Sequence, residues 1–314
     1  MMAIINEGDD WMDSTDLAVF EAVARAGGIT RAAAALHTVQ SNVTARIQAL
    51  ERELGVPLFH RHSRGVALTS GGEALLPYAV RVGALLDEAR RVVCGEGEPR
   101  GPLHIGSLET TAGLRLPPVL AAFSAAYPTV ELTLQTGTSR ELIAAVLEHQ
   151  LEGALVVGPV GHPELLEERV FVEELVLVSS PREASLEAAL RRASGGRLLV
   201  LRAGCSYRER LERLLAQRGI AGARLLEFGT LEGIIGCAAA GMGITLLPRG
   251  VAQSARHAGR VAVHPLPPHE AFVETVFIRR ADGFVSAALE RFVEACRQAG
   301  EAAAPEAPQG RNVA

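Results

Sequence analysis

A short run of hydrogen-bonding side chains stands out in the first sixth of the chain. Gln40, Ser41, Asn42, Thr44 and Arg46 lie within seven positions of one another. Side chains of these types and lengths reach base edges and phosphates in a DNA major groove. On an isolated helix, a solvated polar face would be the more common explanation. The elements that surround the run must decide between the two.

An apolar stripe at helical spacing accompanies this polar run. Its members are Val43, Ile47, Leu50 and Leu54. The spacing predicts a helix that buries this face, with Thr38 or Ser41 as its N-cap and Gly55 beyond its end. The polar run then lies on the opposite, exposed face near the helix start.

Two shorter helical patterns precede it. The first has Leu17, Phe20 and Val23 on one face and stops at the glycine pair 27–28. The second is alanine-rich, runs over residues 31–36 with Thr30 as its expected cap, and ends at His37. Its small side chains allow another helix to approach closely.

A basic loop follows the third pattern. Residues 55–59 return an apolar pair to the core, and residues 60–65 form a cationic hairpin tip before the strand 66–68. The tip places Arg61 and Arg64 where a wing touches phosphates. This order of elements predicts a winged helix-turn-helix over residues 14–72 and favours DNA binding over a merely solvated face. The residues expected at DNA are Thr30, Arg31, Thr38, Gln40, Ser41, Asn42, Thr44, Arg46, Arg52, Arg61 and Arg64.

Residues 73–95 show one long helical pattern with apolar positions alternately four and three apart. These positions are Leu75, Ala79, Val82, Leu86, Ala89 and Val93. Such a heptad seam needs a partner, and we expect the same helix of a second copy. The alternative is packing against the chain's own next domain. Pro77 lies in the first turns, where it disturbs a helix least.

A glycine- and proline-rich hinge at 95–102 opens a region in which strand and helix patterns alternate. Strands are predicted at 103–105, 130–134, 153–158, 174–178, 197–201, 244–247 and 273–278. Helices are predicted at 116–126, 141–148, 207–218, 229–240 and 284–296. This alternation indicates a parallel α/β sheet. We expect one lobe from 101–171 with 277–299, a second from 172–276, and two crossovers between them.

Four turns in this region end a strand and open a helix, at residues 107–110, 137–139, 204–207 and 229–231. Free N–H groups at such turns attract anions, although any single one is more often an ordinary cap. The residues expected at a small-molecule ligand are Ser107, Glu109, Thr110, Thr138, Ser139, Arg202, Cys205, Ser206 and Thr230. Arg202 or Arg140 would pair with a carboxylate and Glu109 with an amine, which suits an anionic or amino-acid-like ligand.

Composition agrees with a cytoplasmic protein. The chain has 314 residues, 48% hydrophobic content and net charge -5, and every fixed cation is arginine because no lysine occurs. No apolar run suits a membrane span, the acidic segment 1–13 resembles a disordered arm rather than a signal peptide, and 302–314 resembles a disordered tail.

The sequence lacks the motifs of common enzymes. There is no G-x-S-x-G elbow, Walker loop or H-E-x-x-H, and the Gly241–Leu246 segment resembles a dinucleotide fingerprint only in part. We expect no metal and no cofactor, because the histidines lack ligand spacing. The four cysteines suit buried thiols in a reducing compartment. Cys205 is the exception, since a helix N-terminus there would stabilise its thiolate and permit redox sensing.

Over residues 17–299 the chain resembles the LysR-type transcriptional regulators of bacteria. The resemblance rests on the segments 20–24, 27–33, 36–37, 50–59 and 68–73, together with Arg61. It differs from many members at Ser41 and Ala45, where those have proline and arginine. The resemblance implies that the third helix enters the major groove, that the linker helix pairs two copies into a dimer or tetramer, and that the second half binds an effector.

Together these observations predict an α+β multidomain protein. It would have an N-terminal winged helix-turn-helix, a long linker helix and a C-terminal two-lobed α/β periplasmic-binding-protein-like domain. Its partners would be double-stranded promoter DNA, a small-molecule effector and further copies of itself. The alternative is a small-molecule binding protein or enzyme with a helical interaction head.

Overall fold

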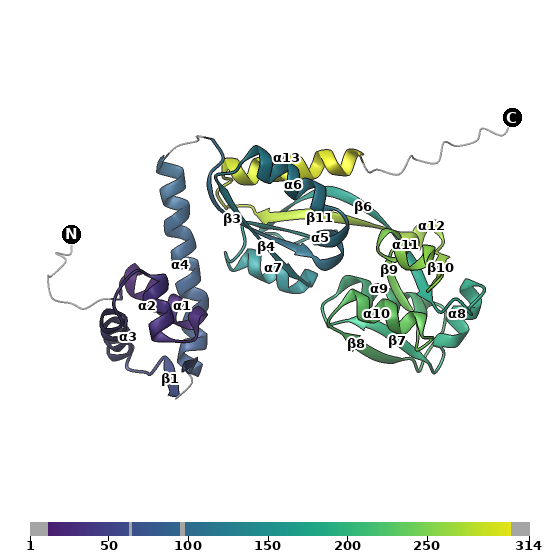
Figure 1. Cartoon of the computed structure of the whole chain (residues 1–314), viewed down its shortest axis with the longest axis horizontal. Coiled ribbons are helices and arrows are strands. Elements are labelled where there is room, and N and C mark those ends of the chain that lie inside the picture. The colour runs from purple at the N-terminus through teal and green to yellow at the C-terminus, as the bar shows by residue number, and fades with distance from the viewer. Residues whose placement is uncertain (1–11, 63–64, 95–97, 303–314) are drawn as a thin grey trace. The chain divides into compact units, whose positions relative to one another are not determined.

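A computed structural model of the protein describes residues 12–62, 65–94 and 98–302. The chain forms two compact units, and the boundary falls between residues 96 and 97 (Figure 1). The arm expected at 1–13 and the tail expected at 302–314 lie almost wholly outside the described residues. Within the described part, no helix has the length and apolar character needed to cross a membrane.

The first unit contains three short helices, a two-stranded hairpin and one long helix. Its elements are α1 (Ser14–Ala26), α2 (Ile29–Ala35), α3 (Gln40–Leu54), β1 (Phe59–His62), β2 (Gly65–Leu68) and α4 (Ser70–Cys94). Phe20, Val23 and Val43 are fully buried at its centre, and the ring of Phe20 lies 5.3 Å from that of Phe59. This is the winged helix-turn-helix that the sequence predicts.

The predicted caps of the second and third helices are wrong. Gly27 adopts φ 61° and ends α1, and α2 then begins at Ile29, so Thr30 lies inside the helix rather than before it. Helix α3 begins at Gln40 after an extended Val39 and has no side-chain cap. The N-cap positions are therefore occupied by Gly28 and Val39, whose side chains cannot cap a helix. Leu54, expected in the core, is 37% exposed.

The wing is tighter than expected. β1 and β2 pair antiparallel from Phe59↔Leu68 to His62↔Gly65, so strand occupies most of the predicted tip. Gly65 has φ 140°, and a Cβ there would lie 2.5 Å from the carbonyl oxygen of Gly27. Only glycine fits this contact, which seats the wing against the end of α1. Arg64 lies outside the described residues, as does the side chain of Arg61.

Helix α4 divides its apolar seam between two environments. Ala79 is buried, and Leu75 and Val82 pack against the core of the winged helix. Leu86 is 40% and Val93 84% exposed. The prediction that the whole seam faces a partner is therefore wrong for its first half, because α1 needs that half to complete its own core.

The second unit is built on a seven-stranded sheet of order β10-β6-β11-β5-β3-β4, with β9 also paired to β6. Its strands are β3 (Gly101–Leu108), β4 (Val130–Gly137), β5 (Gly153–Val157), β6 (Leu165–Ser179), β9 (Thr245–Pro248), β10 (Ala262–Pro265) and β11 (Phe272–Arg280). A separate parallel pair is formed by β7 (Arg197–Leu201) and β8 (Arg224–Phe228). Gly101 and Pro102, expected in the hinge, belong to β3.

The expectation of a purely parallel sheet is wrong. β3 is parallel to β4 and β5, but β11 is antiparallel to β5 and β6. β6 and β11 are the two predicted crossovers, and they pair with each other over most of their length. One carries the chain out of the first lobe and the other carries it back, so they must run in opposite directions.

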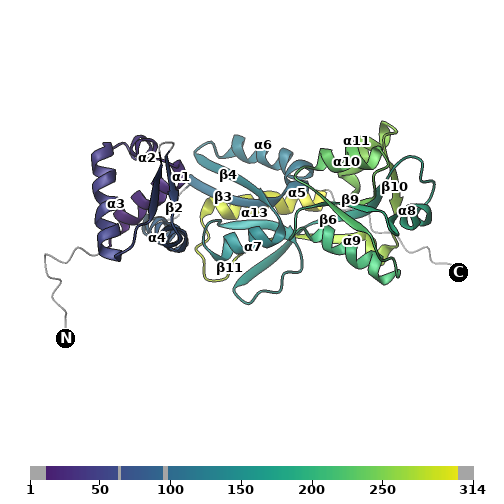
Figure 2. The ribbon, with the colours of Figure 1, turned by 90° about the horizontal axis from the view of Figure 1, so that it is seen from below.

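Helices cover the sheet and enclose separate cores. They are α5 (Glu109–Leu114), α6 (Leu116–Ala126), α7 (Ser139–Leu147), α8 (Leu186–Ala193), α9 (Ser206–Gln217), α10 (Leu231–Ala239), α11 (Arg249–His257), α12 (Pro268–Ala271) and α13 (Ala287–Ala302). α6 and α13 pack together over β3 and β11, while α7 packs beside β5 (Figure 2). α9 and α10 enclose the cores of the other lobe. The two-lobed architecture therefore agrees with the sequence, although α5, α8, α11, α12, β8 and β10 were not predicted.

Candidate DNA-binding and effector sites

The start of α3 carries the polar surface that the sequence predicts. Gln40, Ser41 and Asn42 are exposed in its first turn. Asn42 Nδ2 donates to Thr38 Oγ1 at 3.0 Å, and Thr30 Oγ1 donates to Gln40 Oε1 at 3.3 Å. Thr30 and Thr38 thus orient the amides of α3, leaving further amide groups and the Ser41 hydroxyl toward solvent.

Thr44 and Arg46, which were also predicted to contact DNA, point part of their bonding capacity into the fold. Thr44 Oγ1 donates to the Gln40 carbonyl at 2.9 Å and is half-buried. Arg46 Nη1 lies 2.7 Å from Asp16 Oδ1 and 3.9 Å from Asp13 Oδ1. The Arg46 guanidinium therefore joins α3 to the start of α1 in this structure.

The other described arginines differ in how far they are committed. Arg31 donates to the carbonyls of Ala26 at 2.6 Å and Gly27 at 2.8 Å, which satisfies the end of α1. Arg52 is exposed, and its one described bond is to the Gln48 carbonyl at 3.2 Å. Arg52 is thus the freer cation.

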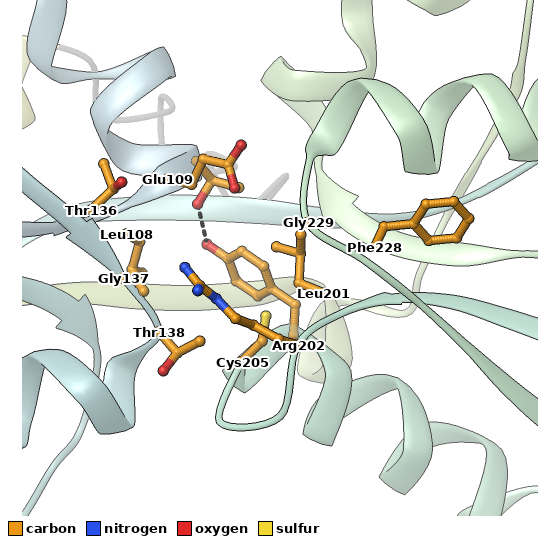
Figure 3. Close-up of a pocket in the computed structure, with 12 residues that line it drawn as sticks. Leu108, Glu109, Thr136, Gly137, Thr138, Leu201, Arg202, Cys205, Phe228 and Gly229 are labelled. Atoms are coloured by element: carbon orange, nitrogen blue, oxygen red, sulfur yellow. Dashed lines mark hydrogen bonds between the residues drawn. The ribbon is translucent and has the colours of Figure 1, made fainter. Parts of the chain in front are cut away.

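A cleft opens between the two lobes of the second unit, with an empty space of about 480 Å³ that includes its open mouth. One lobe contributes Leu108, Glu109, Thr110, Thr136, Gly137 and Thr138, and the other contributes Leu201, Arg202, Cys205, Tyr207, Phe228 and Gly229. Figure 3 shows the Arg202 side chain extending across the cleft toward Leu108 and Gly137. The lining is mostly apolar with a few polar groups, as expected for a small-molecule site.

A hydrogen bond between two lining residues joins the lobes across the cleft. Thr110 Oγ1 and Tyr207 Oη lie 3.3 Å apart, and both residues are buried (Figure 3). Burial raises the pKa of the Tyr207 phenol, so it stays neutral. Arg202 is exposed, and Glu109 is half-buried on the opposite lobe. The cleft thus offers one cation, one carboxylate and neutral hydroxyls.

Two of the four predicted anion-binding turns are capped by the protein itself. The Thr138 N–H donates to Glu141 Oε2 at 2.8 Å, and the Glu141 N–H donates to Thr138 Oγ1 at 3.3 Å, which is a capping box. The Thr138 N–H lowers the pKa of Glu141, with a smaller effect from Arg202. Thr230 caps α10 by accepting from the Gly233 N–H at 3.2 Å. The starts of α5 and α9 have no side-chain cap.

Five of the nine predicted effector residues line the cleft, namely Glu109, Thr110, Thr138, Arg202 and Cys205. The other four do not. Ser107 is buried and donates to the Leu108 carbonyl, Thr230 is occupied as a cap, and Ser206 Oγ donates to Ser139 Oγ at 2.9 Å. The last bond joins α9 of one lobe to α7 of the other.

Seven lining residues were not among the nine predicted for the effector, although four of them lie in the predicted turns, namely Leu108, Gly137, Tyr207 and Gly229. Tyr207 is the most informative of them. Tyr207 stands next to Cys205 and Ser206 in a predicted turn, but a tyrosine in an amphipathic helix usually belongs to the core. Its hydroxyl partner, Thr110, is 97 positions away in sequence. Nothing in the sequence around Leu108, Leu201 and Phe228 distinguishes apolar residues that line a pocket from those that end an ordinary buried strand.

The redox expectation for Cys205 is not supported. Cys205 is 7% exposed, and burial raises the pKa of its thiol. The N–H groups of Arg208 and Tyr207 lower that pKa, but their effect is smaller than that of burial. The uncharged thiol is therefore favoured, contrary to the stabilised thiolate expected from the helix start.

Comparison with known families gives a decisive match to both units. Residues 14–73 match the family described as bacterial regulatory helix-turn-helix protein, lysR family, and residues 96–301 match the LysR substrate binding domain. The chain belongs to the LysR family of transcriptional regulators. It is 44% identical over 277 residues to the HTH-type transcriptional regulator GltR of Bacillus subtilis, covering 88% of this chain and 93% of that protein. It is 46% identical over 283 residues to the regulator YofA of the same organism, covering 90% and 98%.

Solved structures of LysR-family regulators share the architecture. The complex of full-length CbnR with its target DNA has a TM-score of 0.65 at 26% identity, covering 92% of this chain and 100% of that chain. Full-length OxyR of Pseudomonas aeruginosa has a TM-score of 0.68 at 22% identity, covering 92% and 94%, and supports the fold alone. The protein is therefore a DNA-binding regulator with an effector-binding domain rather than an enzyme.

Proposed function

We propose that this LysR-family regulator binds promoter DNA as a homo-oligomer and that a small molecule in the cleft between the lobes modulates this binding. The cleft carries the proposal. It places a cation, a carboxylate and hydroxyls from two lobes around one apolar space, so a ligand there contacts both lobes at once. A ligand that prefers one lobe arrangement shifts the population toward it, typically by about 1 to 3 kcal/mol.

DNA reading is assigned to the first turn of α3. Gln40, Ser41 and Asn42 are exposed there, and their groups suit base edges. Arg52 and the wing arginines would contact phosphates, which supplies affinity without sequence information.

Self-association is assigned to the exposed face of α4. Its large apolar side chains include Tyr78, Leu85, Leu86, Val92 and Val93, each at least 40% exposed. Tyr78, Leu85 and Val92 are seven residues apart, which is the repeat of a coiled-coil seam. Exposed apolar stripes of this kind mark association surfaces.

The effector would be anionic or amino-acid-like. Arg202 reaches into the cleft and suits a carboxylate, while Glu109 on the opposite lobe suits an amine. Arg140, the other arginine considered from the sequence, lies outside the lining and stands 3.9 Å from Glu209. The geometry therefore favours Arg202 as the carboxylate partner.

A footprint on the DNA upstream of the protein's own gene tests the proposal. The full-length protein should protect phased half-sites at physiological salt with competitor DNA, and a metabolite extract should change the protected pattern. Arg202→Gln should abolish the change while leaving protection by the unliganded protein intact, and Arg140→Gln should retain both. Equal responses in the two variants would exclude the assigned effector site, and a folded protein without protection at any salt would exclude the DNA-binding proposal.

A further inference from the structure

A second empty space lies directly behind the cleft, inside the lobe that carries Arg202. It amounts to about 240 Å³ when the open solvent at its edge is included. Its free interior is only large enough for about one water molecule or one methyl group. Leu201, Cys205 and Tyr207 line both spaces, so these residues lie at the wall between them.

The lining of this void is almost wholly apolar. It comprises Leu199, Val200, Leu201, Cys205, Tyr207, Arg208, Leu211, Ile234, Thr245, Leu246 and Leu247. Arg208 does not bring its charge inward, because its guanidinium binds Glu212 at 3.2 Å and Glu227 at 2.9 Å. An apolar group that fills this space gains dispersion contact with the side chains that line it.

Cys205 has the smallest side chain of the three residues that line both spaces. The hydroxyl of Tyr207 is held by Thr110 at 3.3 Å, which fixes the ring on the other side. An apolar substituent of a ligand seated at Arg202 and Glu109 would therefore enter the lobe past Cys205.

We propose that this void is a side pocket of the effector site and that the effector is an amino acid with a short aliphatic side chain. The proposal rests on the proposed function, since it takes the cleft as the effector site. Cys205 and Leu211 then select ligand length. Cys205 forms the entrance and Leu211, on α9, forms part of the far wall.

Titration calorimetry of the full-length protein with straight-chain amino acids from glycine to norleucine tests this inference. The Kd should fall by about fourfold for each methylene that enters the void and stop falling once the void is full. Leu211→Phe narrows the void without touching the cleft lining and should remove the gain for the longer members only. Leu214→Phe is the matched control, because Leu214 is buried on the same helix but does not line the void.

Several outcomes would overturn the inference. Identical length profiles in Leu211→Phe and Leu214→Phe would show that no side chain enters the void. Should Leu211→Phe fail to fold, Leu211→Val must shift the preferred length by one methylene, and an unchanged preference would refute the side pocket. If no amino acid in the series binds the wild type, the aliphatic class is wrong, whereas the footprint with metabolite extract judges the effector site separately.

Discussion

Gly204→Ala should lower the unfolding free energy in two ways, through backbone strain and through a steric clash between the lobes. Gly204 has φ +90°, and a Cβ there would lie 3.0 Å from Thr138 Oγ1 and 3.2 Å from Arg140 Cβ. Thr138 and Arg140 belong to the opposite lobe, so the added methyl group would press the lobes apart. Gly222 has φ +79° with nothing within 4 Å of an added Cβ, which makes Gly222→Ala the matched control.

The expected losses follow from these contacts. Alanine at positive φ costs about 1 to 2 kcal/mol of folding free energy at either site. Gly204→Ala should lose about 1 kcal/mol more, at the low end for overpacking, because the Thr138 hydroxyl is held by the capping box with Glu141. Urea unfolding of both full-length variants, followed by far-UV circular dichroism, measures the difference. Equal losses would refute the close lobe contact at Gly204.

Three further predictions concern ion pairs and protonation. A double-mutant cycle of Arg46→Gln and Asp16→Asn should give a coupling free energy of about 0.5 to 1 kcal/mol in stability, since the pair is partly exposed. Asp16→Asn alone should tighten DNA binding, because it frees Arg46 to reach phosphates. Unchanged DNA binding would show that Arg46 has a structural role only. Burial lowers the pKa of His264 despite two nearby glutamates, so the unfolded chain binds more protons and the unfolding free energy should fall as pH drops below about 6.5; His264→Gln should lose this slope between pH 7.5 and 5.5. Arg249 holds the pKa of Glu174 below its usual value through bonds of 2.6 and 2.5 Å, so this stability is present above about pH 4.5 and lost on acidification. Arg249→Gln should cost up to about 1 kcal/mol at pH 7 and progressively less as the pH falls below about 4.5.

Elements with a strong local signal were predictable from the sequence. The glycine pair at 27–28, the alanine-rich α2 and the apolar stripe of α3 each determine a boundary or a face by local chemistry. β7, predicted at 197–201, has the bounds Arg197–Leu201 because a continuous apolar run is bounded by turn residues on both sides. Such signals need no knowledge of distant partners.

Elements that depend on distant partners were shortened or missed. β6 spans 15 residues, but only 174–178 were predicted, because the charged residues 167–169 interrupt the apolar pattern. These residues pair with β11 where both sheet faces are partly solvated, so the strand is held by its partner rather than by its own periodicity. α8 and α11 have only eight and nine residues, too few for a long periodic pattern, and neither was predicted.

The residues of the cleft likewise differ in how far local sequence predicts them. Glu109, Thr110 and Thr138 were predicted because polar residues after a strand indicate the start of a helix. Tyr207 was missed because its role depends on Thr110, which only the fold brings to it. The self-capping of Thr138 was equally invisible, since it depends on where the Glu141 side chain points.

The division of α4 between a buried and a bare half has a mechanical consequence. The helix spans 25 residues, or about 37 Å at the standard rise, and its first half shares a core with α1. A rotation imposed on the exposed second half of α4 therefore rotates the whole winged helix-turn-helix with it. Inserting a single residue between Val82 and Leu85 would turn the bare face by about 100° relative to the head, whereas inserting seven would restore its phase. The number of residues in α4 therefore sets the angle between its exposed apolar face and the winged helix.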